Sequence, residues 1–360
     1  MSSIEWTDKT WNPLVGCSRV SEGCRHCYAE RFVHRKLSPQ HRGLTLAGEK
    51  GPRWNGEVRL VEARLGDPLR WRKPQRVFVN SLSDLFHESV AFETIAAIFG
   101  VMAGARHHTF QLLTKRPQRA REFFAWVRES AEDMVASIGV APGAAAEVGF
   151  CASLVPFGRD ALRIALRAPW PLPNVWLGVS VEDQRTADER IPVLLELPAA
   201  LRFVSYEPAL GPIDFDLPRC DECGEAARAW SEDGAPWCSE HERECSYGHW
   251  LDFPSDGSFG VPAGEAANGG IAWAIVGGES GPGARPFDVA WARSTIEQCR
   301  AAGTKCFVKQ LGARPIAARH TIASLGGEVA EPLALRHRKG ADPSEWPEDL
   351  RVREMPEVRS

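Results

Sequence analysis

Short apolar runs alternate with amphipathic stretches along most of this 360-residue chain. The runs are five or six residues long and end in polar side chains, a pattern typical of buried parallel strands. They lie at 76–81, 109–114, 175–180, 201–205, 271–276 and 305–309, after a first strand near 4–10. Apolar residues with helical spacing between the runs predict helices at 28–37, 90–102, 118–127, 185–196 and 289–302.

The last predicted helix has recognisable boundaries. Asp288 is of the residue type that accepts hydrogen bonds from the first turn, so we expect it to be the N-cap. Gly303 is suited to the left-handed conformation that often ends a helix. Val289, Ala292 and Ile296 share one face, which predicts that this face packs against the core.

Strands that alternate with helices form parallel sheets. Six or seven such units fit a full or partial (β/α) barrel over residues 1–312, and a doubly wound open sheet is the alternative. Two segments interrupt the alternation. Residues 129–171 are rich in alanine, acidic residues and proline, and residues 216–269 carry four cysteines. Residues 38–57 are predicted to form a long loop, and the charged, proline-rich residues 313–360 an extension that packs on the outside.

The composition is that of an ordinary soluble globular protein, with 44% hydrophobic and 25% charged residues. The formal net charge of −4 gives no global signal for nucleic acid binding, although net charge does not report a local basic cleft. The N-terminal residues lack the apolar core of a secretion signal, and no apolar run is long enough to cross a bilayer. We therefore expect a cytoplasmic protein without membrane contact.

Each predicted strand ends in a polar cluster. The carboxyl ends of barrel strands converge on one mouth, so these clusters of carboxylates, hydroxyls and basic groups predict a polar active site. The candidate binding residues are Ser81, Asp84, Thr114, Lys115, Ser180, Glu182, Glu207, Gly278, Glu279 and Lys309. The competing interpretation is that these residues cap helices or pair with one another in salt bridges.

Two of these strand ends have a distinct composition. The glycine-rich residues 277–283 either let backbone N–H groups approach a ligand or make a plain tight turn. Residues 114–117, Thr-Lys-Arg-Pro, offer two cations for a carboxylate or phosphate, or form a solvated charged face.

The ten cysteines favour metal or redox chemistry over disulfides in a cytoplasmic chain. Cys17, Cys24 and Cys27 have the spacing C-x6-C-x2-C and form an incomplete tetrahedron. Such a set holds zinc with a ligand from elsewhere, or an iron–sulfur cluster with one open iron. We interpret Cys151, Cys299 and Cys306 as buried small hydrophobic residues.

A second cysteine group lies in the segment 216–269. Cys220, Cys223, Cys238 and His241 have the spacing C-x2-C-x14-C-x2-H, which predicts a zinc ribbon, and Cys245 is a rival fourth ligand. The segment has few apolar residues, so a structural zinc would supply its folding energy. A closed site with four ligands has no open position for catalysis.

Several stretches together resemble a known family, the phage-borne, uncharacterised proteins with a fold of the radical S-adenosylmethionine (SAM) type. Two of them are Trp11-Asn-Pro-Leu-Val-Gly-Cys17 and Gly23-Cys-Arg-His-Cys-Tyr-Ala-Glu30. The others lie at 77–87, 112–117, 176–182, 276–283 and 307–310. They cover most of the chain apart from the two interrupting segments and the C-terminal extension.

The resemblance implies a [4Fe–4S] cluster on Cys17, Cys24 and Cys27, with SAM chelating the open iron. One electron would cleave SAM, and the resulting 5′-deoxyadenosyl radical would abstract a hydrogen atom. Ser81, Asp84, Ser180 and Glu182 would suit the methionyl and ribose groups of SAM. The resemblance also implies an electron donor such as a flavodoxin or ferredoxin. It leaves the substrate open, with a nucleic acid base as one candidate by analogy.

The chain departs from the usual radical-SAM pattern at two points. That pattern is C-x3-C-x2-C with an aromatic residue before the last cysteine, whereas here the first gap is six residues and His26 takes the aromatic position. The usual Gly-Gly-Glu motif follows the second strand, whereas here 277–279 follow a late strand. Two other functions therefore stay open: a nucleic-acid-binding or processing protein with zinc at both cysteine groups, and a non-catalytic iron–sulfur protein.

Overall fold

The computed structural model describes residues 4–138 except 37 and 50, residues 170–215, 270–322 and 327–357, and five short strands between 219 and 248. The described residues fall into two compact units. The first holds residues up to Val179 together with Glu196–Leu201, and the second holds Ser180–Leu195 and the described residues from Arg202 onward.

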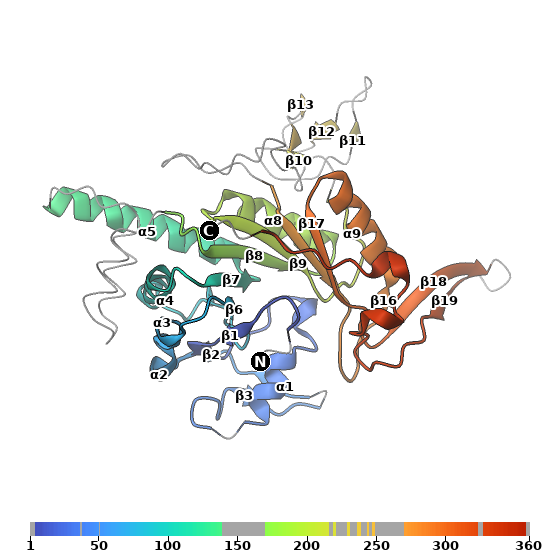
Figure 1. Ribbon diagram of the computed structural model, residues 1–360, viewed down its shortest axis with the longest axis horizontal. Coiled ribbons are helices and arrows are strands. Elements are labelled where there is room, and N and C mark those ends of the chain that lie inside the picture. The colour runs from blue at the N-terminus through green and yellow to red at the C-terminus, as the bar shows by residue number, and fades with distance from the viewer. Residues whose placement is uncertain are drawn as a thin grey trace. The chain divides into compact units, whose positions relative to one another are not determined.

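The first unit is built on parallel strands (Figure 1). Strand β6 pairs with β1 on one side and with β7 on the other, and β7 also pairs with β8. The strands are β1 (Lys9–Trp11), β6 (Arg76–Val79), β7 (Thr109–Thr114) and β8 (Val175–Val181). The two long helices, α4 (Phe92–Gly104) and α5 (Pro117–Ile138), pack together through the buried rings of Phe99, Phe123 and Phe124.

Shorter elements surround these strands. They are β2 (Leu14–Val15), η1 (Glu22–Cys24), α1 (Tyr28–His34), β3 (Thr45–Leu46), β4 (Arg53–Trp54), β5 (Arg59–Leu60), α2 (Glu62–Leu65) and α3 (Asp67–Arg70). β2 pairs antiparallel with β5, and β3 with β4. The expected loop at 38–57 therefore contains a small hairpin.

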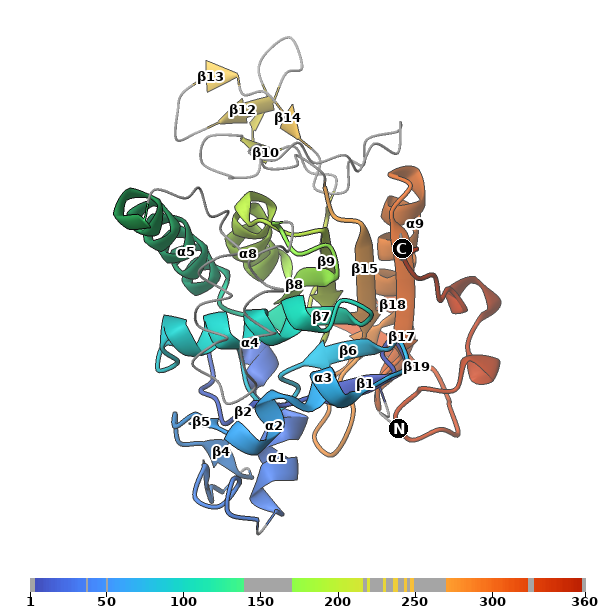
Figure 2. The same ribbon diagram turned by 60° about the vertical axis from the view of Figure 1, so that its left-hand side comes forward.

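The second unit repeats the pattern (Figure 2). Strand β15 (Trp273–Gly277) pairs parallel with β9 (Leu201–Tyr206) and β17 (Lys305–Gln310). Its helices are α8 (Gln184–Glu196) and α9 (Val289–Ala301), and α9 lies against β15 and β17. Asp288 caps α9 by accepting a hydrogen bond from the backbone N–H of Ala290 at 3.0 Å, and Gly303 has φ +69° after its end, so both predicted boundaries are confirmed. Cys299 and Cys306 are buried as predicted, and Cys151 lies outside the described residues.

The C-terminal extension is more ordered than its composition indicates. It contains β18 (Pro315–Ile322) and β19 (Gly327–Pro332), which form an antiparallel hairpin beside β16 (Phe287–Asp288), and the turns η3 (Pro343–Glu345) and η4 (Glu348–Leu350). Residues 352–354 then run along β17, where Glu354 N donates to Cys306 O and Val308 N to Val352 O. The extension thus covers backbone groups that an edge strand would otherwise expose.

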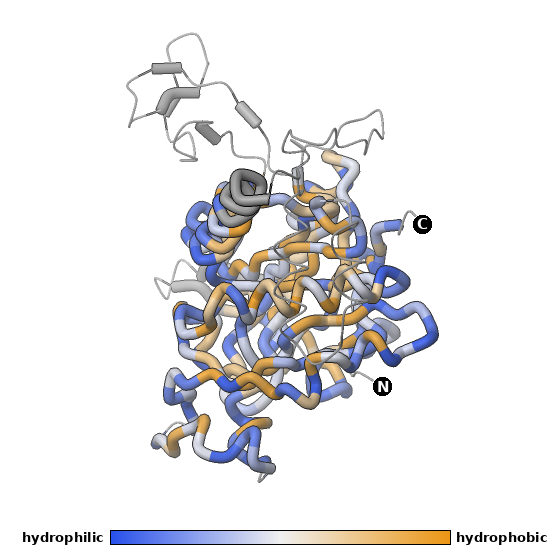
Figure 3. Tube along the Cα trace, turned by 90° about the vertical axis from the view of Figure 1, so that its left-hand side faces the viewer, coloured by the Kyte–Doolittle hydropathy of each residue, from blue (hydrophilic) through white to orange (hydrophobic). Residues whose placement is uncertain are grey.

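The seven longer strands belong to one sheet in the order β1-β6-β7-β8-β9-β15-β17, which is also their order along the chain. A doubly wound sheet reverses its strand order at a switch point, whereas a barrel sheet does not. The order therefore favours a mixed α/β fold with a partial (β/α) barrel, as predicted. Hydrophobic and hydrophilic residues alternate along much of the trace (Figure 3).

Element boundaries differ most from the sequence prediction in two places. The first strand covers Lys9–Trp11 rather than 4–10, and α5 continues eleven residues beyond the predicted end at Val127. The rest of the interrupting segment, 139–169, lies outside the described residues. Among the described helices, none has the length and apolar character needed to cross a membrane.

Five short strands are described in the second interrupting segment. β10 (Arg219–Cys220) pairs with β14 (Tyr247–Gly248), and β12 (Pro236–Cys238) lies between β11 (Ala229–Trp230) and β13 (Arg243–Glu244). The side chains of the predicted zinc ligands there, Cys220, Cys223, Cys238, His241 and Cys245, lie outside the description.

Candidate functional site

The cysteine loop is held against the end of β6 by backbone contacts. Gly16 N donates to Leu82 O at 3.1 Å, and Gly16 forms a parallel bridge with Ser83. Gly16 has φ +107°, and a Cβ there would lie 2.1 Å from the carbonyl oxygen of Glu57. Only glycine fits this position, because both the left-handed backbone and the close approach exclude a side chain. The loop that begins at Cys17 therefore starts from a fixed point.

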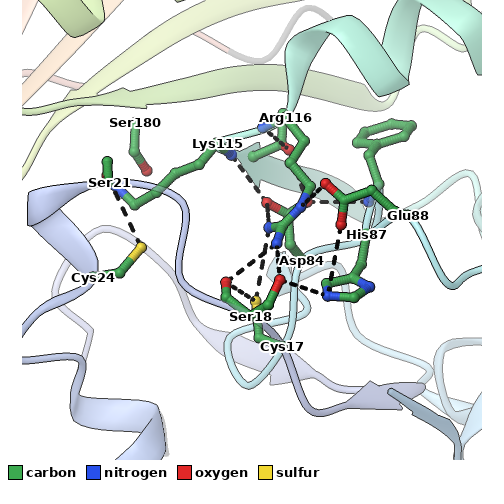
Figure 4. Close-up of polar contacts among 12 residues, drawn as sticks. Cys17, Ser18, Ser21, Cys24, Asp84, His87, Glu88, Lys115, Arg116 and Ser180 are labelled. Atoms are coloured by element: carbon green, nitrogen blue, oxygen red, sulfur yellow. Dashed lines mark hydrogen bonds and ion pairs between the residues drawn. The ribbon is translucent and has the colours of Figure 1, made fainter. Parts of the chain in front are cut away.

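The Asp84 carboxylate organises this end of the strands (Figure 4). Its Oδ1 accepts hydrogen bonds from Phe86 N at 3.0 Å and Thr114 Oγ1 at 2.7 Å. Its Oδ2 accepts from Lys115 N at 3.0 Å and Arg116 Nη1 at 3.1 Å. Both side chains of the Asp84–Arg116 ion pair are buried. This carboxylate ties the end of β6 to the end of β7.

Arg116 extends this hydrogen-bond network to the cysteine loop. Its Nη1 lies 3.8 Å from Cys17 Sγ, and its Nη2 donates to the hydroxyl and carbonyl oxygens of Ser18 at 2.8 and 3.2 Å. Its Nε donates to Glu88 at 2.9 Å. One buried guanidinium thus contacts a carboxylate, a thiol and a hydroxyl.

His87 completes this network from the side of Ser18. Its Nδ1 accepts a hydrogen bond from Ser89 N at 3.2 Å, so the neutral ring carries its proton on Nε2, which lies 2.9 Å from Ser18 Oγ. Burial lowers the pKa of His87, and the nearby charge of Arg116 lowers it further. The imidazole is therefore held in its neutral form.

Burial and neighbouring groups shift the pKa values of two thiols of the loop, Cys17 and Cys27. Burial raises the pKa of Cys17 to about 12, Asp84, Cys24 and Cys27 raise it too, and Arg116 opposes them. Burial also raises the pKa of Cys27, whereas the backbone N–H groups of Ala29 and Glu30, in the first turn of α1, lower it. These contacts would stabilise thiolates, while burial favours neutral thiols in the protein alone.

An ion pair between the partly exposed Arg19 and the buried Glu30 joins the loop to α1. Arg19 donates from Nε and Nη2 to the two carboxylate oxygens of Glu30, at 2.8 and 2.5 Å. Glu30 is 1% exposed, and its Oε1 also accepts from Trp54 N at 3.1 Å. The bidentate geometry sets the direction in which the loop between Cys17 and Cys24 leaves the helix.

A second polar group lies where β6 ends. Ser81 Oγ and Leu82 N both donate to Asn12 Oδ1, and Tyr28, the residue after Cys27, donates to Ser81 O at 2.7 Å. Asn80 is 3% exposed with φ +60°, and among the described residues neither its Oδ1 nor its Nδ2 has a hydrogen-bond partner. A buried amide without partners is unfavourable by about 1–3 kcal/mol per group, so this side chain is suited to meet a ligand.

The second unit has its own polar group at the carboxyl ends of β9, β15 and β17. Lys309 Nζ donates to both carboxylate oxygens of Glu207, at 2.8 and 2.7 Å. Gln310 Nε2 donates to Glu207 at 3.2 Å and to Gly278 O at 2.9 Å. Both members of the Glu207–Lys309 pair keep 18% side-chain exposure, so the pair is accessible to water.

Two further strand-end carboxylates are engaged by arginines. Glu279 accepts from Arg285 at 2.8 to 3.2 Å and closes the turn at 279–285. Buried Glu182 is paired with Arg190 at 3.1 Å. A Cβ on Gly278 would lie 2.7 Å from Leu311 O and 2.8 Å from Phe287, so packing explains this glycine and favours the tight-turn interpretation.

Seven of the ten predicted binding residues fall into two groups. Of the other three, Ser180 is buried in β8, and Glu182 and Glu279 pair with arginines. Ser81, Asp84, Thr114 and Lys115 lie around the cysteine loop in the first unit, whereas Glu207, Gly278 and Lys309 form a separate group in the second. All four predicted carboxylates pair with a basic side chain, as the competing interpretation held. Sequence reasoning gave no role to Ser18 and His87, and it placed Asn80 and Arg116 in polar strand ends without giving them partners.

In the part of the chain that the structure describes, no three His, Cys, Asp or Glu side chains are arranged as a metal-ligand group. The described cysteines of the loop are free thiols that form no disulfide bond.

Comparison with protein families identifies the chain at the level of a family. The family described as Protein of unknown function (DUF5131) matches residues 1–338 of 360. The chain belongs to the DUF5131 family. The match includes both units, the cysteine loop and every candidate binding residue. No curated protein and no solved structure matches the chain.

The site of this DUF5131 protein therefore has to be interpreted from its own residues. It combines three thiols on one loop, one buried guanidinium and one buried amide without partners among the described residues.

Proposed function

We propose that this protein is a radical-SAM-type enzyme in which Cys17, Cys24 and Cys27 hold a [4Fe–4S] cluster. The observation that carries the proposal is that Cys17, Cys24 and Cys27 lie on one loop, which starts at the fixed Gly16 and is contacted at Cys17 and Ser18 by the buried Arg116. The described strand ends nearby offer oxygen and nitrogen groups and no fourth thiol. A set of three thiolates that lacks a fourth protein ligand suits a cluster with one iron open to a small molecule.

The residues around the loop have chemical groups that suit an iron–sulfur cluster and SAM. Cys17 lies within reach of the Arg116 guanidinium, and the first turn of α1 points backbone N–H groups at Cys27. Such donors favour the thiolate forms that iron binds. The buried amide of Asn80 offers a donor and an acceptor for a polar ligand such as SAM.

When bound, the cluster would supply the electron that cleaves SAM to give a radical able to abstract hydrogen. The protein's own residues would position and shield that chemistry. Gly16 and the Arg19–Glu30 pair fix the loop, and the Asp84–Arg116 pair holds it against the ends of β6 and β7. Ser81 and Asn80 would contact SAM from the end of β6.

In the second unit, we propose that the accessible Glu207–Lys309 pair and the buried Ser180 provide polar groups for a ligand of that unit. The buried pair Glu182–Arg190 and the turn closed by Glu279 and Arg285 would support that surface. We further propose a structural zinc on Cys220, Cys223, Cys238 and His241 or Cys245. The substrate stays open, with a nucleic acid base as one candidate.

The test is an anaerobic reconstitution with iron and sulfide, followed by SAM and dithionite. We expect a brown protein that forms 5′-deoxyadenosine, and loss of both colour and product in Cys24→Ala. Cys299→Ala is the matched control, because Cys299 is a buried cysteine in α9 that no proposed group uses.

Other outcomes would point elsewhere. A colourless protein that holds two zinc ions would contradict the proposal and favour the nucleic-acid-binding alternative. A brown protein that never cleaves SAM, tested with cell extract as a source of substrate, would favour a non-catalytic iron–sulfur protein.

A further inference from the structure

The three cysteines of the loop have different neighbours (Figure 4). Arg116 Nη1 donates to Cys17 Sγ at 3.8 Å. Cys24 Sγ lies 4.0 Å from Ser21 Oγ, and backbone N–H groups in the first turn of α1 approach Cys27. Cys17 therefore receives a hydrogen bond from a cationic side chain, which distinguishes its sulfur within the loop.

Each N–H group of the Arg116 guanidinium has an acceptor among the described residues. Nε donates to Glu88 at 2.9 Å, and Nη2 donates to the hydroxyl and carbonyl oxygens of Ser18 at 2.8 and 3.2 Å. Nη1 donates one hydrogen to Asp84 Oδ2 at 3.1 Å, which leaves its second hydrogen for Cys17. Because the guanidinium is planar and all of its nitrogens are engaged, the direction in which Nη1 points is fixed. The side chain is 5% exposed, so water has little access to it.

Two carboxylates compensate the positive charge of Arg116. Asp84 and Glu88 pair with the guanidinium at 3.1 and 2.9 Å. A metal centre on the loop would therefore meet a directed hydrogen bond at Cys17 rather than the field of an unpaired cation. Hydrogen bonds to the sulfur ligands are among the factors that set the reduction potential of an iron–sulfur cluster. They stabilise the reduced state more than the oxidised state, because reduction adds negative charge to the cluster and its sulfurs.

We propose that Arg116 is a positioning residue that raises the reduction potential of a cluster bound to the loop, acting through the sulfur of Cys17. The inference rests on the proposed function, which assigns the cluster to this loop. In the reduction an external reductant such as dithionite loses one electron and the cluster gains it, and no bond is made or broken. Ser18 and Glu88 contribute to the same effect, because they hold the guanidinium in the orientation that directs Nη1 at Cys17.

The test is an anaerobic redox titration of the reconstituted protein, followed through the electron paramagnetic resonance signal of the reduced cluster. Arg116→Lys keeps the positive charge beside Asp84 and removes the planar fork that directs a hydrogen bond at Cys17. We expect its one-electron reduction to be about tenfold less favourable than that of wild type, which corresponds to about 59 mV. Iron content per chain is measured alongside and should match wild type, so that a change in potential is distinguished from a loss of cluster.

Two further variants provide a smaller change and a control. Ser18→Ala removes one acceptor of Nη2 and leaves the Asp84–Arg116 pair in place, so its reduction should be less favourable by about threefold. This variant also tests the proposal if Arg116→Lys does not fold. Arg121→Lys makes the same substitution on α5 at an exposed residue that pairs with Glu196, and its potential should equal that of wild type.

The outcomes separate this inference from the proposed function. Equal potentials in wild type, Arg116→Lys and Ser18→Ala would overturn the role of Arg116, and the proposed function would stand if wild type still forms 5′-deoxyadenosine. A lowered potential in Arg116→Lys, together with a wild type that never cleaves SAM, would leave the role of Arg116 in place and contradict the proposed function. A wild-type protein that takes up no cluster would contradict both.

Discussion

Arg116 donates hydrogen bonds from the same nitrogen, Nη1, to Asp84 Oδ2 at 3.1 Å and to Cys17 Sγ at 3.8 Å. The ends of two strands and the start of the cysteine loop therefore share one buried guanidinium. Both charges of the Asp84–Arg116 pair lie out of water, so removing one leaves the other uncompensated.

The first prediction concerns this ion pair. Arg116→Ala should lower the free energy of unfolding by about 3–5 kcal/mol, because Asp84 would be left buried without its counter-charge. Arg116→Lys should lose less unfolding free energy, since lysine keeps the positive charge. Lysine lacks the additional guanidinium nitrogens that reach Ser18 and Glu88. Urea unfolding of the purified variants measures both. A loss below about 1 kcal/mol in Arg116→Ala would show that the other hydrogen bonds of the Asp84 carboxylate compensate for the lost guanidinium.

The second prediction separates stability from ligand binding at Asn80. Asn80→Gly keeps a residue suited to φ +60° and removes an amide without described partners, so the folded protein should be as stable or more stable. The same change should weaken SAM binding to the reconstituted protein by about tenfold, the loss of one or two hydrogen bonds. Calorimetric unfolding and SAM titration provide the two readings. Unchanged SAM affinity would remove Asn80 from the proposed site.

The third prediction is a pH dependence of stability. The pKa of His87 is lowered in the folded protein by burial and by Arg116, so the unfolded chain binds more protons below the ordinary pKa of about 6.5. Its contribution is therefore complete above that pH and is lost as pH falls below it. His41 and His108 have lowered pKa values too and act in the same direction.

A matched variant isolates the His87 contribution. Between pH 7.5 and 5.5, wild type should lose more unfolding free energy than His87→Gln, which does not titrate. Equal losses would mean that His87 is protonated equally in both states.

The fourth prediction tests the packing explanation for Gly278. Gly278→Ala should destabilise the protein by about 1–3 kcal/mol, because its methyl group would meet Leu311 O and Phe287 at less than 3 Å. Gly51→Ala in the first unit is a useful comparison, since nothing lies within 4 Å of a Cβ there although its φ is +110°. Thermal unfolding measures both. A Gly278→Ala protein of full stability that binds ligand poorly would instead support direct ligand contact at this glycine.

The fifth prediction concerns the second cysteine group. Elemental analysis should find one zinc per chain that disappears in Cys220→Ser/Cys223→Ser, because two thiolates of the proposed tetrahedron are lost. The first unit should stay folded in this double variant. Iron binding at its cysteine loop is therefore the internal control. Full zinc content in the double variant would exclude this site.

The sequence by itself determined the elements whose signals are local. The apolar runs at 109–114 and 201–205 correspond to β7 and β9, and Asp288 and Gly303 bound α9, because a strand's composition and a helix cap are decided within a few residues. The alternation of strands and helices also favoured the partial barrel, because parallel strands need crossover connections between them. The spacing of Cys17, Cys24 and Cys27 was enough to identify them as candidate metal ligands.

Only the tertiary structure decided what the polar strand ends contact. Asp84 and Arg116 are 32 residues apart, and Glu207 and Lys309 are 102 apart, so the arrangement of the strands in the sheet determines each pairing. The ordered C-terminal extension depends in the same way on an exposed edge at β17. That the amide of Asn80 has no partner among the described residues likewise appears only once its neighbours are placed. Sequence composition identified chemical groups at the carboxyl ends of the strands, whereas packing decided which of them are already paired and which remain suited to a ligand.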